Sequence, residues 1–173
     1  MSAATRERVS AALEGLACEL GETVDATPTV TVARDDLHDA AQRLRDRAGF
    51  ETNTFVTAID HFPRDPRFEV ACQLLSVSHN DRVRLRTLVS ENDARVPSVV
   101  DLWAGAAFSE RECFDMFGIR FDGHAGLKRL MMPEEYEHHP LRKDFPHEGI
   151  EPDRLYREWD RARRAAEAGG KRS

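Results

Sequence analysis

The chain begins with a stretch in which apolar positions follow the period of a helix. Between Thr5 and Leu20 they recur every three or four residues and Gly21 comes next, the apolar residues being Val9, Ala12, Leu13, Leu16 and Leu20. Such spacing places apolar side chains along one side of a helix. We therefore predict an amphipathic helix that covers the core and ends at Gly21.

A strand and a second helix are predicted next. Thr29 to Val32 follows Pro28 as a short β-branched run, which is typical of a strand. Asp35 or Asp36 is placed to cap a helix that ends at Gly49, with an apolar face of Leu37, Ala40, Ala41, Leu44 and Ala48. We interpret this strand and helix as scaffold.

Three strands separated by short turns are predicted at Phe50–Asp60, Arg67–Val77 and Arg82–Val89. In the second and third strands, the residues at odd and even positions form two sets that alternate along the strand. The short turns imply an antiparallel meander. The third strand carries arginines at positions 82, 84 and 86, which share one face. We assign them to a solvated outer face, with contact to an acidic partner as the alternative. The predicted fold class is α+β, a mostly antiparallel sheet backed by helices, with an extended irregular C-terminal segment.

A third helical region opens at Pro97-Ser98 and continues through Ala106 to Phe117, with Ser98 as its predicted N-cap. Its last turns interleave charged and large apolar residues, namely Glu110, Arg111, Glu112, Phe114, Asp115, Met116 and Phe117. Arg111 and Asp115 are spaced to pair across one turn, which contributes only about 0.2–0.5 kcal/mol when exposed. We predict a helix buried on nearly its whole circumference, between its own sheet and a second surface that supplies counter-charges.

Beyond Gly118, which suits the left-handed residue that ends a helix, the chain cannot remain helical because Pro133 and Pro140 interrupt it. This stretch is dense in Met, Leu, Phe, His and charged residues. Irregular chain must either satisfy its backbone polar groups when buried or leave an apolar patch when exposed. We therefore predict that 109–145 forms the functional surface.

Composition narrows the function classes. The chain has 173 residues and a net charge of -6, which argues against nucleic acid as a partner. No apolar run approaches the roughly 20 residues needed to span a bilayer, and no secretory leader is visible. Three scattered cysteines indicate a reducing compartment without a disulfide framework. We divide the chain into one domain at 1–150 and a charged tail at 151–173.

The tail contains seven basic and five acidic residues. Leu155, Trp159, Ala162 and Ala166 keep helical spacing, which predicts a short helix that frays at Gly169-Gly170. A solvated, partly disordered tail is the favoured interpretation, and docking of Trp159 on a partner is the alternative.

The sequence also offers candidates for catalysis and for metal binding. Cys113 could act as a nucleophile, and His124 with Glu110 or Asp115 could form an acid–base pair, as in a free-standing hydrolase. His124, His138, His139 and His147 fit no common zinc spacing. We prefer an interpretation without catalysis and without metal on this chain.

The run ERECFDMFGIRFDGHAGLKRLMMPEEYEHHPLRKDFP resembles the signature of the C subunit of the respiratory NADH:quinone oxidoreductase, complex I. Its ordered elements are matched by Glu110–Glu112, Asp115–Ile119, Gly123-His124, Leu127–Leu130 and His139–Pro146. Upstream, FVTAIDHF, RFEVACQLLSV and VPSVVDLW are also similar, so the resemblance covers Phe50 to Pro146. The chain departs from the family pattern at Phe108, Ala125-Gly126, Tyr136 and His138.

The resemblance implies a structural subunit of the peripheral arm, without an active site of its own. In the family's complex, electrons pass from NADH through FMN and iron–sulfur clusters to quinone, and these groups are expected on partner subunits. The chain's own cysteines agree, because an iron–sulfur cluster needs about four cysteine ligands. The expected location is the cytoplasmic side of the inner membrane, reached only through the complex. A membrane-bound hydrogenase or another quinone oxidoreductase is the alternative assembly.

The implied partners are the large quinone-site subunit (D), the terminal-cluster subunit (B) and the ferredoxin-like subunit. Arginine, lysine and carboxylate side chains in consecutive positions after a proline could bind a neighbouring chain. The residues that we expect at this interface are Glu110, Arg111, Glu112, Asp115, Met116, Phe117, Gly118, His124, Arg129, His139, Pro140, Arg142, Lys143 and Asp144.

Overall fold

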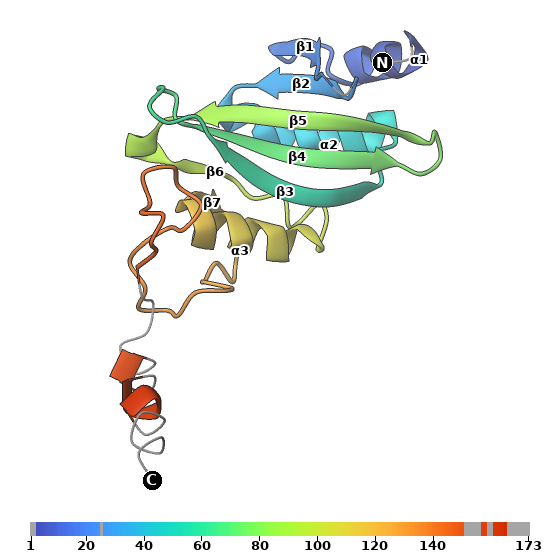
Figure 1. Ribbon diagram of the computed structural model, residues 1–173. Helices are drawn as coiled ribbons and strands as arrows, with labels where there is room; N and C mark the ends of the chain where they lie inside the picture. The colour runs from blue at the N-terminus through green and yellow to red at the C-terminus, as the bar shows by residue number, and fades with distance from the viewer. Residues whose placement is uncertain (1–2, 25, 151–156, 159–160, 166–173) are drawn as a thin grey trace.

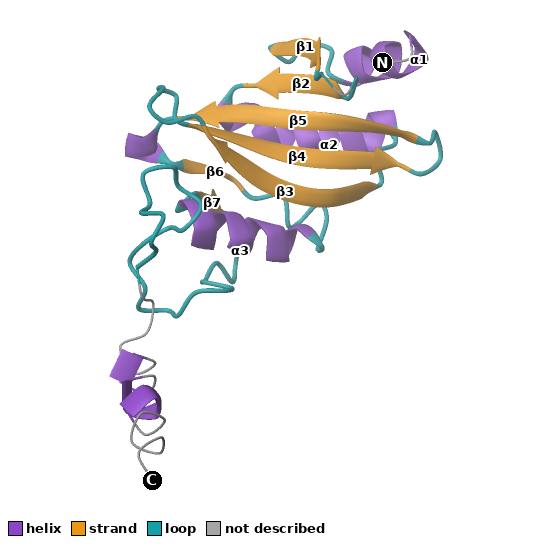
Figure 2. Ribbon diagram, in the orientation of Figure 1, coloured by secondary structure: helices purple, strands orange, loops and turns teal. Residues whose placement is uncertain are grey.

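The computed structural model describes residues 3–24, 26–150, 157–158 and 161–165. A five-stranded sheet is covered on one face by three helices (Figures 1 and 2). The elements are α1 (Ala3–Ala12), β1 (Cys18–Glu22), β2 (Pro28–Val32), η1 (Arg34–Asp36), α2 (Leu37–Ala48), β3 (Thr52–Asp60), β4 (Phe68–Ser76), β5 (Asp81–Val89), η2 (Glu91–Asp93), β6 (Arg95–Pro97), α3 (Ala106–Phe117) and β7 (Arg120–Asp122). This arrangement confirms the predicted α+β class.

The meander β3-β4-β5 forms as predicted, with antiparallel pairing throughout. The sheet order is β1-β2-β5-β4-β3, so β2 joins the meander by pairing parallel with β5. Sequence alternation did not indicate this parallel pair, because it joins segments about 50 residues apart. Strand β4 lies in the middle of the meander and is buried along most of its length.

The first helix is shorter than predicted. Helix α1 ends at Ala12, and Leu20 and Gly21 belong to strand β1, which pairs with β2. Gly15 has a φ of 80°, a left-handed conformation that takes the chain out of helical geometry. The prediction was wrong because apolar residues at helical spacing continue across this break, where Leu20 instead packs from a strand.

Helix α2 agrees closely with the sequence. Asp36 occupies its N-cap position, although its side chain makes no capping hydrogen bond, and Gly49 ends the helix with a φ of 68°. The predicted apolar residues of this helix are all buried beneath the sheet. The core contains those residues together with the inward side chains of β2 to β5.

The third helix begins later than predicted, at Ala106 rather than beside Ser98. The 98–105 stretch forms turns, in which the Val100 N–H donates to Ser98 Oγ at 3.2 Å. Before it, β6 pairs parallel with β7 in a small second sheet that the sequence did not predict. Both corrections have one cause, because the chain at 95–99 is held by residues more than ten positions away.

Residues 123–150, called the 123–150 segment below, contain no helix or strand and pass beside α3 (Figure 2). This confirms the predicted irregular segment. In the tail, residues 157–158 and 161–165 are helical and exposed, whereas Leu155, Trp159 and Ala166 lie outside the described residues. Within the described ranges, no helix has the length and apolar content to cross a bilayer.

Candidate functional site

Asp115 is the central anchor of the region that the sequence singled out. Its side chain is fully buried on α3, and its Oδ2 accepts hydrogen bonds from three consecutive backbone N–H groups, those of Leu130 at 2.9 Å, Met131 at 2.7 Å and Met132 at 2.9 Å. Arg129 Nη1 donates to Oδ1 at 2.7 Å. Burial raises the pKa of Asp115, but these donors outweigh it and hold the pKa below its usual value.

The expected pairing of Arg111 with Asp115 does not form. Arg111 Nε and Nη2 instead donate to the carbonyl oxygens of Lys128 at 3.1 Å and Arg129 at 2.8 Å. An i, i+4 ion pair contributes too little to compete with the donors around Asp115. Helix α3 therefore holds residues 128–132 from two positions, through an arginine that binds carbonyls and an aspartate that binds N–H groups.

The end of α3 is covered by the His139–Arg142 stretch. His139 Nδ1 lies 2.9 Å from the Asp115 carbonyl oxygen, and Arg142 Nε donates to the Phe117 carbonyl at 2.7 Å. These contacts satisfy carbonyl groups that a helix C-terminus leaves unpaired, and a cation there is electrostatically favourable. Gly118 ends the helix as predicted, with a φ of 77°. A Cβ atom on it would lie 2.6 Å from His139 Nε2, so the packing is close.

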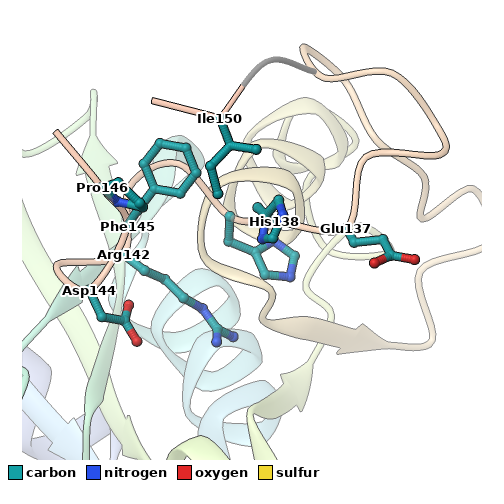
Figure 3. Close-up of a pocket in the computed structure, with 8 residues that line it drawn as sticks. Glu137, His138, Arg142, Asp144, Phe145, Pro146 and Ile150 are labelled. Atoms are coloured by element: carbon teal, nitrogen blue, oxygen red, sulfur yellow. The ribbon is translucent and has the colours of Figure 1, made fainter. Parts of the chain in front are cut away.

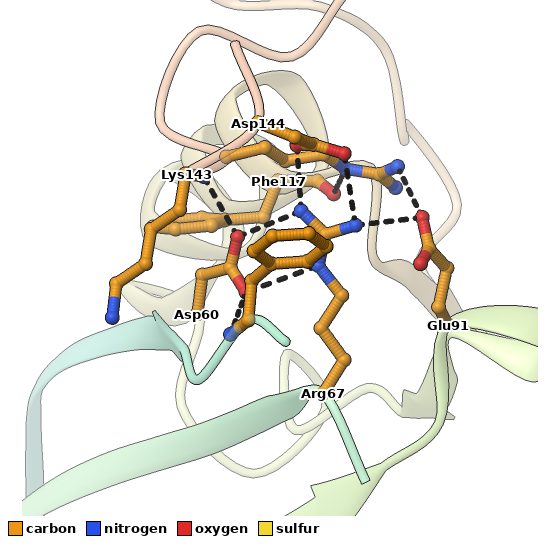
Figure 4. A network of polar contacts seen from close by, with 8 residues as sticks. Asp60, Arg67, Glu91, Phe117, Lys143 and Asp144 are labelled. Carbon is orange, nitrogen blue, oxygen red and sulfur yellow. Dashed lines mark hydrogen bonds and ion pairs between the residues drawn. The ribbon is translucent and has the colours of Figure 1, made fainter. Parts of the chain in front are cut away.

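A charged cluster joins the 123–150 segment to the end of the sheet (Figure 4). Arg67 is only 3% exposed and binds Asp60 at 2.8 Å, Asp144 at 2.6 Å and Glu91 at 2.9 Å. The Lys143 N–H also donates to Asp60 Oδ2, at 2.8 Å. Burial raises the pKa of Asp60, but the bonds from Arg67 and the two backbone donors lower it to about 2. The cluster therefore contains an ionised, nearly buried pair.

Three members of this cluster, Asp60, Arg67 and Glu91, were not among the predicted site residues. Asp60 and Arg67 lie on either side of a turn with two prolines, and this close pair of opposite charges was the one indication that the sequence offered. Their partner Asp144 is 77 positions from Arg67. The cluster is further packed by Phe68, whose ring centroid lies 5.1 Å from the Arg67 Cζ atom and 5.2 Å from that of Arg142.

Glu110 faces inward and is fully buried. It accepts hydrogen bonds from Ser98 Oγ at 2.6 Å and from the Val99 N–H at 2.8 Å, which fixes the turns before α3. Burial raises the pKa of Glu110 above its ordinary value, and the two donors only partly oppose this. Glu112, by contrast, is exposed on the outer side of α3. The predicted interface residues therefore do not lie on one surface.

The alternative hydrolase arrangement is not assembled. Cys113 is 2% exposed, burial raises the pKa of its thiol, and its Sγ lies 3.5 Å from the Val56 carbonyl oxygen. His124 Nε2 is 3.1 Å from the Ala107 carbonyl, and its Nδ1 accepts from the Gly126 N–H at 3.0 Å. These contacts hold the imidazole by backbone groups rather than by Cys113, Glu110 or Asp115. A buried thiol of raised pKa is a poor nucleophile.

A cavity of about 210 Å³ lies within the 123–150 segment (Figure 3), lined by Glu137, His138, His139, Arg142, Asp144, Phe145, Pro146 and Ile150. It is smaller than the roughly 300–1,000 Å³ of usual ligand sites. Burial lowers the pKa of His139, and the nearby Arg142 lowers it further. Among the described residues, no group of three or more His, Cys, Asp or Glu side chains is arranged to hold a metal ion.

Apolar side chains project outward from the framework that these bonds create. Phe108 on α3 is 64% exposed, Met131 is 56% exposed and Leu141 is 52% exposed, with Leu130 at 37%. The backbone of Leu130 and Met131 is fixed by Asp115, so the points from which these exposed side chains project are fixed as well. We call these four residues, one on α3 and three along the 123–150 segment, the outer apolar patch. Surfaces of this kind usually mark contact sites.

Comparisons with known proteins agree with the sequence resemblance. A family model described as the respiratory-chain NADH dehydrogenase 30 Kd subunit matches residues 30–151. The NADH-quinone oxidoreductase C subunit of Roseiflexus castenholzii is 47% identical over 122 residues, which cover 68% of this chain and 69% of the relative. The same protein of Citrifermentans bemidjiense is 41% identical over 126 residues, covering 73% of this chain and 77% of the relative.

Two solved structures are also similar. A trypsin-resistant fragment of Nqo5 superimposes with a TM-score of 0.64 and 30% identity, covering 71% of this chain and 99% of the fragment. A chain of an archaeal membrane-bound sulfane sulfur reductase, a respiratory membrane complex, superimposes with a TM-score of 0.70 and 25% identity, covering 82% of this chain and 85% of that chain. The chain therefore belongs to the family of the respiratory-chain NADH dehydrogenase 30 Kd subunit, whose bacterial relatives include the C subunits of NADH-quinone oxidoreductases.

Proposed function

We propose that this chain is a peripheral, non-catalytic subunit of an NADH-quinone oxidoreductase, and that it acts by holding neighbouring subunits through the 123–150 segment and the outer side of α3. The proposed neighbours are the large quinone-site subunit (D), the terminal-cluster subunit (B) and the ferredoxin-like subunit. The chain reaches the cytoplasmic side of the inner membrane only through them. FMN, iron–sulfur clusters and quinone belong to those partners.

The observation that carries this proposal is the outer apolar patch on a rigid support. Asp115, Arg111 and Arg142 bond to backbone groups of their own chain, so these motif charges fix the segment rather than pointing outward. This refines the predicted interface, in which the charges themselves met the partner. The support keeps apolar anchors in one conformation before binding, which lowers the entropic cost of association.

The cysteines support the absence of a redox group on this chain. Cys72 and Cys113 are buried in the core, and only Cys18 is exposed. Burial raises the pKa of the Cys72 thiol to about 12. Cluster ligation requires about four thiolates, and this set offers too few, with two of them held in the protonated form.

Recovery of the assembled complex tests the proposal. We expect Met131→Asp to leave the purified chain folded, because the side chain is 56% exposed, but to lower its recovery with neighbouring subunits roughly tenfold. Val24→Asp introduces the same charge at a fully exposed valine beyond β1 and serves as the matched control. Native-gel and affinity recovery from membranes provide the measurement. Equal recovery of the two variants would contradict the proposed contact surface.

A second candidate is the equivalent subunit of another membrane-bound respiratory complex. The superposition with a chain of the sulfane sulfur reductase, at a TM-score of 0.70, supports this candidate. The two candidates predict different companions, since an NADH-oxidising flavoprotein accompanies only the first. Identification of the subunits that co-purify with the tagged chain separates them.

A further inference from the structure

The sheet has one face that no described element covers. Helix α2 lies behind the sheet in Figures 1 and 2, and the buried residues of α1 and α3 belong to the same core as α2 and the inward side chains of β3, β4 and β5. Along β5 the odd-numbered Val83, Leu85 and Thr87 are fully buried toward those helices, whereas the even-numbered positions alternate to the uncovered side. The even-numbered residues of β5 are Arg82, Arg84, Arg86 and Leu88. We call this side the bare face.

Register across the strands shows how apolar and charged residues are distributed over the bare face. Ile59 of β3, Glu69 of β4 and Leu88 of β5 form one row, and Phe55, Gln73 and Arg84 form another. Ile59 is 41% exposed, Phe55 42% and Leu88 44%. The three arginines follow β5 at alternate positions, so their attachment points are about 7 Å apart.

The arginines exceed the carboxylates that face them. Arg86 Nε donates to Thr31 Oγ1 at 2.8 Å and its Nη1 lies 3.7 Å from Glu69, a carboxylate that also lies 3.3 Å from His61. Arg84 Nε donates only to the neutral Gln73, at 3.2 Å. The side chain of Arg82 has no hydrogen bond or ion pair within the part of the chain that the structure describes. The bare face therefore offers two guanidinium groups without a carboxylate partner from the described residues.

We propose that the bare face binds an acidic segment of another protein chain, with carboxylates spaced to reach Arg82 and Arg84 and with separate apolar side chains that cover Phe55, Ile59 and Leu88. Guanidinium groups bind carboxylates in a bidentate geometry, and the exposed apolar residues of the same face favour a protein over a nucleic acid. The chain's own tail is a poor candidate because it carries seven basic and five acidic residues. This surface is distinct from the outer apolar patch and adds a second contact to the proposed function.

Zero-length cross-linking identifies the chemistry of the occupant. The experiment uses membranes that contain the Arg82→Lys or Arg84→Lys variant of the chain. A carbodiimide joins the amine of the new lysine only to a carboxylate in direct contact with it. We expect an amide link from these positions to an aspartate or glutamate of another subunit, located by mass spectrometry. Arg47→Lys, at an exposed position of α2, is the matched control and should give no such link.

Charge reversal provides the second measurement. We expect Arg82→Glu with Arg84→Glu to lower recovery in the complex roughly tenfold, while Arg47→Glu with Arg120→Glu, which changes the net charge equally, leaves it unchanged. Thermal unfolding of the purified chains shows that each variant is folded. Absence of any link to another chain, or equal recovery of the two double variants, overturns the proposal. Arginine-dependent flotation with phosphatidylglycerol vesicles but not phosphatidylcholine vesicles also overturns it, because the occupant is then the membrane.

If Met131→Asp does not reduce assembly while the arginine reversal does, the proposed contact through the outer apolar patch is refuted and the proposed contact through the bare face is supported. If Met131→Asp reduces assembly while the arginine reversal does not, only the proposed contact through the bare face is refuted. The two proposals therefore fail separately.

Discussion

Replacing Gly118 with alanine measures how firmly the 123–150 segment is held on α3. Two costs add. Alanine in a left-handed backbone conformation is less favourable than glycine by about 1–2 kcal/mol. The new Cβ would also lie 2.6 Å from His139 Nε2 and 2.7 Å from Arg142 Nη2, so both side chains must move away. Their hydrogen bonds to helix carbonyls are then lost, at about 1 kcal/mol for the imidazole and about 2 kcal/mol for the guanidinium. The expected total is about 4–5 kcal/mol.

Gly15→Ala is the matched control, because Gly15 has a φ of 80° and a Cβ there meets nothing within 4 Å. It should cost only the backbone term of about 1–2 kcal/mol. Urea unfolding measures both variants, and the difference of about 3 kcal/mol corresponds to a midpoint shift of roughly 1–2 M.

Trypsin cleavage after Lys128, Arg129 and Arg142 should also accelerate in Gly118→Ala and not in Gly15→Ala. If the two variants have equal midpoints and wild-type protease resistance, the described packing against Gly118 is incorrect.

Two further variants, together with the pH dependence of the wild type, test the charged groups. Asp60→Asn removes the carboxylate that pairs with the buried Arg67 and should destabilise the chain by about 3 kcal/mol in urea unfolding, whereas an unchanged midpoint would show that the cluster contributes little. The wild type should lose stability as pH falls from about 4 to about 2, because the pKa of Asp60 is lowered to about 2 and the unfolded state therefore binds protons first. Thermal scans should show a weaker acid dependence in Asp60→Asn. The pKa of Glu110 is raised by burial, so its contribution has the opposite sign and is lost as pH rises through the folded value. Glu110→Gln should therefore change stability by only about 1 kcal/mol at neutral pH and compare more favourably with the wild type at higher pH; a large loss at every pH would disprove this.

Local sequence patterns were sufficient to predict the β3-β4-β5 meander and helix α2. Alternating side chains with short turns define antiparallel neighbours, and Gly49 marks the end of α2 through its left-handed backbone. The start of α3 and the end of α1 were predicted wrongly because pairing with residues outside each helix decides them. Ser98 donates to Glu110 instead of starting the helix, and β1 forms because β2 is available to pair with it.

The motif indicated segments that the structure brings together, but it did not indicate the partners of their charges. Sequence spacing suggested that Asp115 pairs with Arg111, yet the buried carboxylate binds Arg129 and three backbone N–H groups. Backbone donors carry no side-chain pattern, so spacing could not reveal them. Arg67 and Asp144 are 77 positions apart and meet only after the sheet has formed. The prediction that this region contacts other subunits is the part that awaits the assembly experiments.

The manner in which Asp115 holds its loop leaves the loop's chemistry open to change. Since the carboxylate recognises main-chain amides, any residue except proline at positions 130 to 132 preserves the attachment. Relatives that assemble with different neighbours could therefore vary the outward side chains by single substitutions without rebuilding the scaffold beneath. A surface of this design tolerates changes of its side chains better than one whose side chains also secure the fold.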